Sequence, residues 1–331
     1  MVAVHHRFAE VDGYRIFYRE AGHRDAPPVV LLHGYPTSSH MFRHLIPRLA
    51  DEYRVVAPDH LGFGFSDAPS VEEFDYTFDA LAAITAKLLE DLGITEYAMY
   101  VMDYGAPIGW RLALANPSAI TAIVSQSGNA YQEGFVEEFW AGLWEYTTDQ
   151  NKQTEAAARE AQTLEAIKWQ YLNGEADPTL VDPLTWVHDH AMVSRPGNDL
   201  IQLRLFRDYA TNPPLYPAVQ EYFRSSQVPL LAVWGRGDEI FRPEGARAFA
   251  RDLPDAQIEL LPGGHFLLES ALDEVTALIR GFLARTLTRG ADLAQEGSGP
   301  VRQGHGEGLD HPGATAMPVA RESEHAGADL S

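Results

Sequence analysis

The feature that most constrains this chain is a short apolar run that ends at an acidic residue and passes directly into a helical pattern. The run covers residues 97–102, Asp103 follows it, and an apolar helical periodicity continues to Asn116. A run of this length predicts a strand buried on both faces. A strand, a sharp turn and a helix in immediate succession can hold a reactive side chain at the tip of a strained turn. The pattern therefore predicts that the Asp103 carboxylate projects from the tip of the turn, where it could react.

Asp103 also has a simpler interpretation as a helix N-cap. An aspartate at the start of a helix often accepts hydrogen bonds from the free N–H groups there. Gly105 and Gly109 allow the close backbone approach that a sharp turn needs, and Pro107 falls in the first helical turn, where a missing N–H costs little. This stretch alone leaves capping and catalysis equally open, so the rest of the chain has to separate them.

Apolar strands alternate with helical patterns along most of the chain. The alternation predicts an α/β fold with a mostly parallel, doubly wound sheet. Residues 7–20 predict a hairpin turning at Asp12-Gly13. Further strands are expected at 28–33, 54–59, 119–127, 229–234 and 257–261.

A long helical segment rich in Trp and Tyr interrupts this alternation, with helices expected at 139–146, 156–171 and 200–209. The expected division is therefore a core over 1–129, a helical lid over 130–226 and the second part of the core over 227–286. The lid would lie over the carboxyl ends of the strands. Residues 287–331 are rich in Gly, Ala, Glu, His and Ser without periodicity, and are expected to be a disordered tail.

Composition excludes several classes of function. The 331 residues include no cysteine, so disulfides, thiolate nucleophiles and cysteine-ligated metals are ruled out. A formal net charge of −22 argues against nucleic acid and anionic membranes as partners. The first residues lack the apolar region of a secretory signal, and no apolar run has membrane-spanning length. A cytoplasmic location is expected.

Two residues beyond later strands could act together with Asp103. Asp238 follows the strand that ends at Trp234, and His265 follows the next strand, directly behind two glycines. The carboxyl ends of parallel strands meet at one edge of a sheet, so these side chains are expected near Asp103. Glu133, which follows the strand ending near residue 127, is the alternative acid.

Together these motifs resemble the α/β-hydrolases of the epoxide hydrolase and haloalkane dehalogenase group. The resemblance spans residues 7–285, and nucleophile, acid and histidine follow the chain order of that fold. No Gly-x-Ser-x-Gly occurs, which counts against a serine esterase. The matching motifs are His-Gly-x-Pro at 33–36, Gly-Phe-Gly-x-Ser at 62–66, Asp-Tyr-Gly at 103–105, Asp238 and His265.

The resemblance implies a covalent mechanism without cofactor or metal. Asp103 would attack an electrophilic carbon and form an alkyl–enzyme ester. His265, oriented by Asp238, would activate the water that hydrolyses the ester. The backbone N–H groups of Tyr35 and Tyr104 would form the oxyanion hole. The expected partner is a small apolar electrophile.

The motifs leave the leaving group open. An aromatic residue after His-Gly, here Tyr35, is typical of epoxide hydrolases, whereas Val101-Met102 and residues 36–39 look more like a dehalogenase. Epoxide opening is favoured, haloalkane dehalogenation is the alternative, and a non-catalytic ligand-binding protein on the same scaffold is a third hypothesis. An opened epoxide needs a proton from a weak acid such as tyrosine.

Residues of the lid and of the first motif are expected to complete the site. Tyr209 resembles the second lid tyrosine of epoxide hydrolases and is the expected proton donor. Tyr146 and Tyr171 compete for the place of the first, and both are expected with His33 at the substrate. The segment His188-Asp-His190 is expected to be exposed and not to bind metal.

Overall fold

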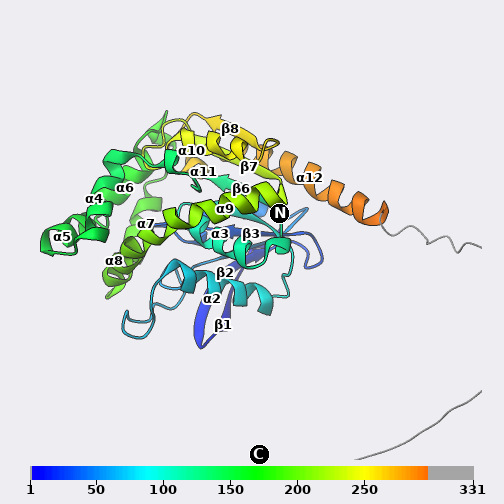
Figure 1. Ribbon diagram of the computed structural model, residues 1–331. Helices are drawn as coiled ribbons and strands as arrows, with labels where there is room; N and C mark the ends of the chain where they lie inside the picture. The colour runs from blue at the N-terminus through cyan, green and yellow to red at the C-terminus, as the bar shows by residue number, and fades with distance from the viewer. Residues whose placement is uncertain (1, 297–331) are drawn as a thin grey trace, which may run out of the picture. The chain divides into compact units, whose positions relative to one another are not determined.

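An eight-stranded sheet organises the computed structural model, which describes residues 2–296 (Figure 1). The strand order is β1-β2-β4-β3-β5-β6-β7-β8. Strand β2 is antiparallel to β1 and β4, and all the remaining pairs of neighbouring strands are parallel. This is the α/β fold that the sequence predicts. The strands are β1 (His5–Val11), β2 (Tyr14–Ala21), β3 (Pro28–Leu32), β4 (Arg54–Pro58), β5 (Tyr97–Met102), β6 (Ile120–Gln126), β7 (Leu230–Gly235) and β8 (Gln257–Leu261).

The ends of the central strands are in register. Leu32 pairs with Val101 across β3 and β5, and Met102 pairs with Gln126 across β5 and β6. The residues that follow these strands therefore emerge side by side at one edge of the sheet. This register brings the loop after β3 next to Asp103, and it sets the floor of the site.

Helices of the core pack against the sheet and against each other. Helix α3 contacts β5, and both α2 and α9 contact α3. The last helix continues to Glu296, beyond the predicted start of the tail at 287, while residues 297–331 of that tail lie outside the described residues. The core helices are α1 (Ile46–Leu49), α2 (Phe78–Asp91), α3 (Gly105–Ala115), α10 (Pro243–Ala248), α11 (Leu267–Ser270) and α12 (Leu272–Glu296).

Between β6 and β7 the chain forms six α-helices, five of which, α4 to α8, group together beside the sheet (Figure 1). Here several predicted boundaries are wrong. The single helix predicted at 156–171 is two helices, because the Thr163 hydroxyl accepts a hydrogen bond from the Ala166 N–H and starts a new one. The helices of this segment are α4 (Glu137–Thr148), α5 (Lys152–Glu160), α6 (Leu164–Leu172), α7 (Leu184–Val193), α8 (Asn198–Asp208) and α9 (Asn212–Ser226).

Helix α9 begins at Asn212-Pro213-Pro214, beyond the last of the helices predicted for this segment. Proline fits the first turn of a helix, because the N–H that it lacks would have no partner there. Prolines can therefore mark the start of a helix as well as a break between two helices. Within residues 2–296, no helix combines the length and apolar character needed to cross a membrane.

Candidate active site

Asp103 occupies the predicted sharp turn between β5 and α3. Its φ is 49°, a left-handed conformation that is strained for a residue other than glycine. Two glycines make the turn possible. A Cβ at Gly34 would lie 2.3 Å from the Asp103 Cβ, and a Cβ at Gly105 would lie 2.1 Å from the Leu32 carbonyl oxygen. Neither position could hold a side chain without moving the turn.

The Asp103 carboxylate accepts hydrogen bonds from two loops. The Tyr35 N–H donates to Oδ1 over 2.7 Å, and the Tyr104 N–H also donates to the carboxylate. An ordinary N-cap bonds the second or third N–H of its own helix, whereas here one donor comes from the loop after β3. The two N–H groups are those predicted for the oxyanion hole.

Burial raises the pKa of the Asp103 carboxyl above its usual value. The nearby His265 ring and the two backbone N–H groups act in the opposite direction, but they do not outweigh burial. A buried carboxylate that has lost its water shell and keeps only two fixed donors is a stronger nucleophile than one in bulk water.

His265 lies between two carboxylates. Its Nδ1 is 3.0 Å from Asp238 Oδ2, and its Nε2 is 3.9 Å from Asp103 Oδ2. Nε2 is buried and has no hydrogen-bond partner within the described part of the chain. The geometry therefore brings together the three residues that the sequence analysis placed at one sheet edge, with His265 in the middle.

Asp238 is held in place by its own set of donors. Oδ1 accepts the N–H groups of Ile240 at 2.9 Å and Phe241 at 3.0 Å. The Ser127 hydroxyl donates over 2.7 Å to Oδ2, the oxygen that also faces His265. Sequence reasoning missed Ser127, although its place directly after β6, next to the strand that leads to Asp238, was a usable signal. Its φ of 50° turns the chain as the strand ends.

The charge state of His265 reflects two opposing effects. Burial by itself lowers the pKa of the ring, but the charge of Asp238, the hydrogen bond to it and the charge of Asp103 together raise the pKa above its usual value. The ring can therefore take up a proton although it is buried, as a general base must.

The alternative acid, Glu133, is not at the site. It forms an ion pair with Arg251, and both side chains are about half exposed. The pKa of Glu133 is lowered by that hydrogen bond. Asp238 is thus the acid that the fold brings to His265.

A cavity of about 160 Å³ opens above Asp103. Its floor comes from the core, and its opposite wall comes mainly from helices α4, α5 and α6 of the segment between β6 and β7, with Phe206 of α8. Most of the lining side chains are apolar, as is typical of a small-molecule site. The lining residues are Tyr35, Asp103, Tyr104, Phe139, Trp140, Gly142, Leu143, Ala157, Ala158, Ala161, Gln170, Phe206 and Ile240.

Comparison with known proteins identifies the fold family. Residues 27–272 match the model of the α/β hydrolase fold family. The chain belongs to this family.

Several proteins of known sequence or structure are similar to this chain. An uncharacterized hydrolase of Saccharomyces cerevisiae is 42% identical over 273 residues, which are 82% of this chain and 93% of that protein. A haloalkane dehalogenase of Mycobacterium marinum is 42% identical over 115 residues, 34% of this chain and 38% of the relative. The crystal structure of the epoxide hydrolase VrEH1 from Vigna radiata has the same fold, with a TM-score of 0.66 and 24% identity over 85% of this chain and 98% of that one. The chain is a hydrolase of this fold that resembles a haloalkane dehalogenase over about a third of its length and shares its fold with an epoxide hydrolase.

In this α/β-hydrolase, the predicted tyrosines differ in their distance from the cavity. Tyr209 packs against two lining residues, Trp140 and Tyr104, with ring centroids 4.6 and 5.7 Å away. Its hydroxyl forms a hydrogen bond with Tyr216. Tyr146 lies elsewhere and lines a separate surface hollow with Arg204 and Arg207.

Two more of the residues predicted at the substrate face other partners. Tyr171 stacks on Phe266 with ring centroids 4.1 Å apart, and its hydroxyl donates to Asp189. His33 is fully buried, its Nε2 accepts the His60 N–H at 3.0 Å, and its Nδ1 is 2.9 Å from the Gly34 carbonyl oxygen. None of the four predicted residues Tyr209, Tyr146, Tyr171 and His33 is among the residues that line the cavity above Asp103, and of the four Tyr209 packs directly on lining residues.

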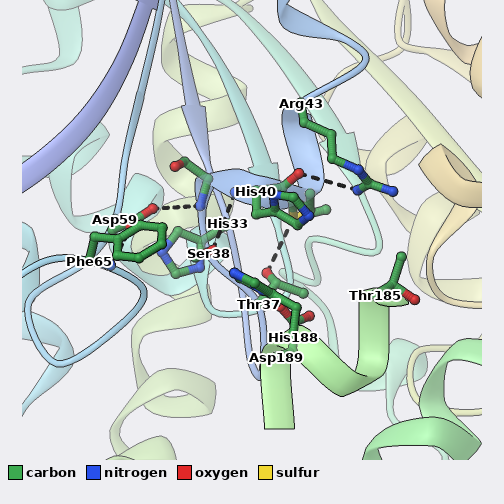
Figure 2. A network of polar contacts seen from close by, with 12 residues as sticks. His33, Thr37, Ser38, His40, Arg43, Asp59, Phe65, Thr185, His188 and Asp189 are labelled. Carbon is green, nitrogen blue, oxygen red and sulfur yellow. Dashed lines mark hydrogen bonds and ion pairs between the residues drawn. The ribbon is translucent and has the colours of Figure 1, made fainter. Parts of the chain in front are cut away.

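The α/β-hydrolase core meets α7 through a polar junction (Figure 2). The His188 ring of α7 stacks on His40 with centroids 4.4 Å apart, and its Nδ1 is 2.9 Å from Asp189 Oδ1. The prediction that residues 188–190 are exposed is wrong. Asp189 is buried and hydrogen-bonds Tyr171 and His188, while His188 and His190 are only partly exposed. The junction thus ties α6 and α7 to the loop after β3.

Proposed function

We propose that the protein is an epoxide hydrolase with Asp103 as nucleophile and His265 as base. One observation carries the proposal: the buried His265 presents Nε2 to Asp103 Oδ2 at 3.9 Å, while Nδ1 is held by Asp238 at 3.0 Å. This arrangement supports a mechanism in which His265 acts as a base next to the Asp103 carboxylate and Asp238 orients its ring.

In the first step, Asp103 Oδ2 attacks a ring carbon of the epoxide. The bond between that carbon and the epoxide oxygen breaks, and an alkyl–enzyme ester and an alkoxide form. Oδ1, which the Tyr35 N–H holds at 2.7 Å, becomes the carbonyl oxygen of the ester. The strained turn fixes the direction of attack, which lowers the entropic part of the barrier.

The alkoxide takes its proton from a tyrosine that packs against the residues lining the cavity. We assign this role to Tyr209, for which burial, Tyr216 and Asp103 raise the pKa well above its usual value. A phenol in this state stays protonated until a strong base such as an alkoxide forms beside it. The hydrogen bond with Tyr216 orients the Tyr209 hydroxyl.

In the second step, His265 Nε2 takes a proton from water, and the resulting hydroxide attacks the carbonyl carbon of the ester. Negative charge develops on Oδ1, where the N–H groups of Tyr35 and Tyr104 stabilise it. The tetrahedral intermediate collapses, the ester C–O bond breaks, and the leaving oxygen takes the remaining proton of the hydroxide, which yields the diol and the Asp103 carboxylate. The proton held by His265 then returns through solvent to the Tyr209 phenolate, which restores both side chains. The raised pKa of His265 suits it to hold this proton.

A haloalkane dehalogenase is the second candidate, because a Mycobacterium marinum enzyme of that name is 42% identical over 115 residues. Halide departure needs no proton, so a tyrosine donor would have no essential role. The same ester and the same base would serve both reactions.

Separate assays of styrene oxide and 1-bromobutane test the assignment. We expect diol from styrene oxide and no bromide from 1-bromobutane, with diol formation reduced at least about 10³-fold in Asp103→Ala. Tyr209→Phe should slow epoxide opening. Bromide without diol would favour the dehalogenase, and neither product would favour a ligand-binding role.

A further inference from the structure

The polar groups in the cavity wall are not equally available to a ligand. Tyr35 Oη donates to the Ala161 carbonyl oxygen at 3.0 Å, and Trp140 Nε1 donates to the Ile240 carbonyl oxygen at 2.9 Å. Both groups are occupied by the protein. The side-chain amide of Gln170 has no hydrogen-bond partner among residues 2–296.

Gln170 differs in this respect from the Tyr104 hydroxyl. That hydroxyl also lacks a partner in the described chain, but it is sealed from solvent by the rings around it. Gln170 as a residue is only 6% exposed, yet its amide atoms are not among the sealed polar atoms. Gln170 is also one of the residues that line the cavity, so its partly accessible amide is a candidate contact for a substrate in that space.

The position of Gln170 is fixed by its neighbours on α6. Ile167 and Tyr171, which flank it in the helix, are fully buried. Tyr171 stacks on Phe266, the residue after His265, and its hydroxyl is held by Asp189. The helix carrying Gln170 is therefore anchored to the loop that carries the proposed base, so the amide is preorganised relative to the reacting groups.

An amide that faces an apolar cavity without a protein partner can hydrogen-bond a polar group of a ligand, whereas a purely apolar ligand would cover the amide and leave it unsatisfied, which is costly. A site built to bond a polar group of the substrate also discriminates against the analogue that lacks it. An aliphatic side chain at position 170 would be the better choice for a purely hydrocarbon substrate.

We propose that Gln170 is a specificity-determining residue whose amide hydrogen-bonds a hydroxyl or carbonyl oxygen of the substrate. The preferred substrate is then a small epoxide that carries one polar substituent on an otherwise apolar chain. The inference rests on the proposed function, because it names the class of epoxide that the Asp103 site takes.

Matched epoxide pairs that differ only in a terminal methyl or hydroxyl group test the proposal. The pairs are 1,2-epoxybutane with glycidol, 1,2-epoxypentane with 3,4-epoxybutan-1-ol, and 1,2-epoxyhexane with 4,5-epoxypentan-1-ol. We expect wild type to prefer the hydroxyl compound in at least one pair. In Gln170→Leu and Gln170→Met, the ratio of kcat/KM for hydroxyl over methyl compound should fall about tenfold in that pair.

Gln202→Leu is the matched control. Gln202 is fully buried on α8, its amide also lacks a partner in the described chain, and it does not line the cavity. The ratio should stay at the wild-type value in this variant. Ratios that fall by no more than about threefold in both Gln170 variants, or a fall of equal size in Gln202→Leu, would overturn the inference alone. No diol from any pair in wild type, with Asp103→Ala as blank, would overturn the proposed function and the inference with it.

Discussion

Two buried histidine environments in this molecule differ in the groups that face the rings. His265 lies between the carboxylates of Asp238 and Asp103, and its pKa is raised. His33 and His60 contact each other in a tilted arrangement with ring centroids 4.2 Å apart, and both rings bond to backbone groups. Burial lowers the pKa of both, to about 4 for His60.

The difference teaches that burial alone makes a histidine neutral and inert, and that a carboxylate at hydrogen-bond distance reverses the effect. All three rings lie beyond strand ends at one edge of the sheet. Only His265 faces acids, so only His265 can exchange a proton in the ordinary working range. His33 and His60 instead shape the loop that presents the Tyr35 N–H.

The largest expected effect is the loss of turnover in His265→Gln, for which His33→Gln serves as the comparison from the other histidine environment. His265→Gln should reduce turnover by about 10⁴-fold or more and leave the ester on Asp103, because no base activates water. Mass spectrometry of the peptide containing Asp103 should show the added mass of the epoxide. His33→Gln should be less stable but should accumulate no adduct. An adduct in both variants, or on another peptide, would erase the distinction between the two environments.

A smaller effect is expected when the acid behind His265 loses its charge. Asp238→Asn should lower kcat by about 10³-fold, because the ring loses its orientation. Activity of wild type falls as pH drops through the raised pKa of His265, since the protonated ring cannot act as base. Without the Asp238 charge that pKa falls, so the acid limb of the kcat profile should move to lower pH.

Ser127→Ala is the control for this pH shift. It removes the 2.7 Å hydrogen bond to Asp238 but keeps the carboxylate. We expect a loss of about tenfold in kcat with the acid limb near its wild-type position. Equal shifts in Ser127→Ala and Asp238→Asn would mean that position, and not charge, sets the pKa of His265.

The smallest effect concerns stability. The folded-state pKa of His60 lies below the usual value of 6.5, at about 4, so unfolding at low pH takes up a proton. The stability that this provides is present above pH 6.5 and is lost as pH falls toward 4, at up to about 1.4 kcal/mol per pH unit. Denaturant unfolding of His60→Gln should show a flatter decline over this range. Parallel declines in wild type and variant would contradict the proposed neutral state of His60.

The fold of the core was predictable because its local signals agree with its tertiary environment. Strands such as β5 are buried on both faces, so a short apolar run predicts them well. The helices between β6 and β7 were harder, because their faces are partly exposed. The additional helix α7 and the prolines that start α9 lack a distinctive apolar pattern.

The site residues also fall into two sets, one that the sequence predicts and one that it does not. Asp103, Asp238 and His265 come together because parallel strands end at one edge, and sequence order reveals that edge. The directions of Tyr146 and Tyr171 depend on how one helix packs on another, which spacing along the chain does not encode. Gln170 was missed for the same reason.

The wall opposite Asp103 is built largely from residues 139–170, one uninterrupted stretch of chain. The proposed nucleophile, base and acid come from strand ends outside it. For an enzyme engineer, this separation means that a library confined to that stretch explores new pocket shapes while the reacting groups keep their supports. Positions 34 and 105 belong on the list of sites to leave untouched, since any side chain there collides with the bend beneath the substrate.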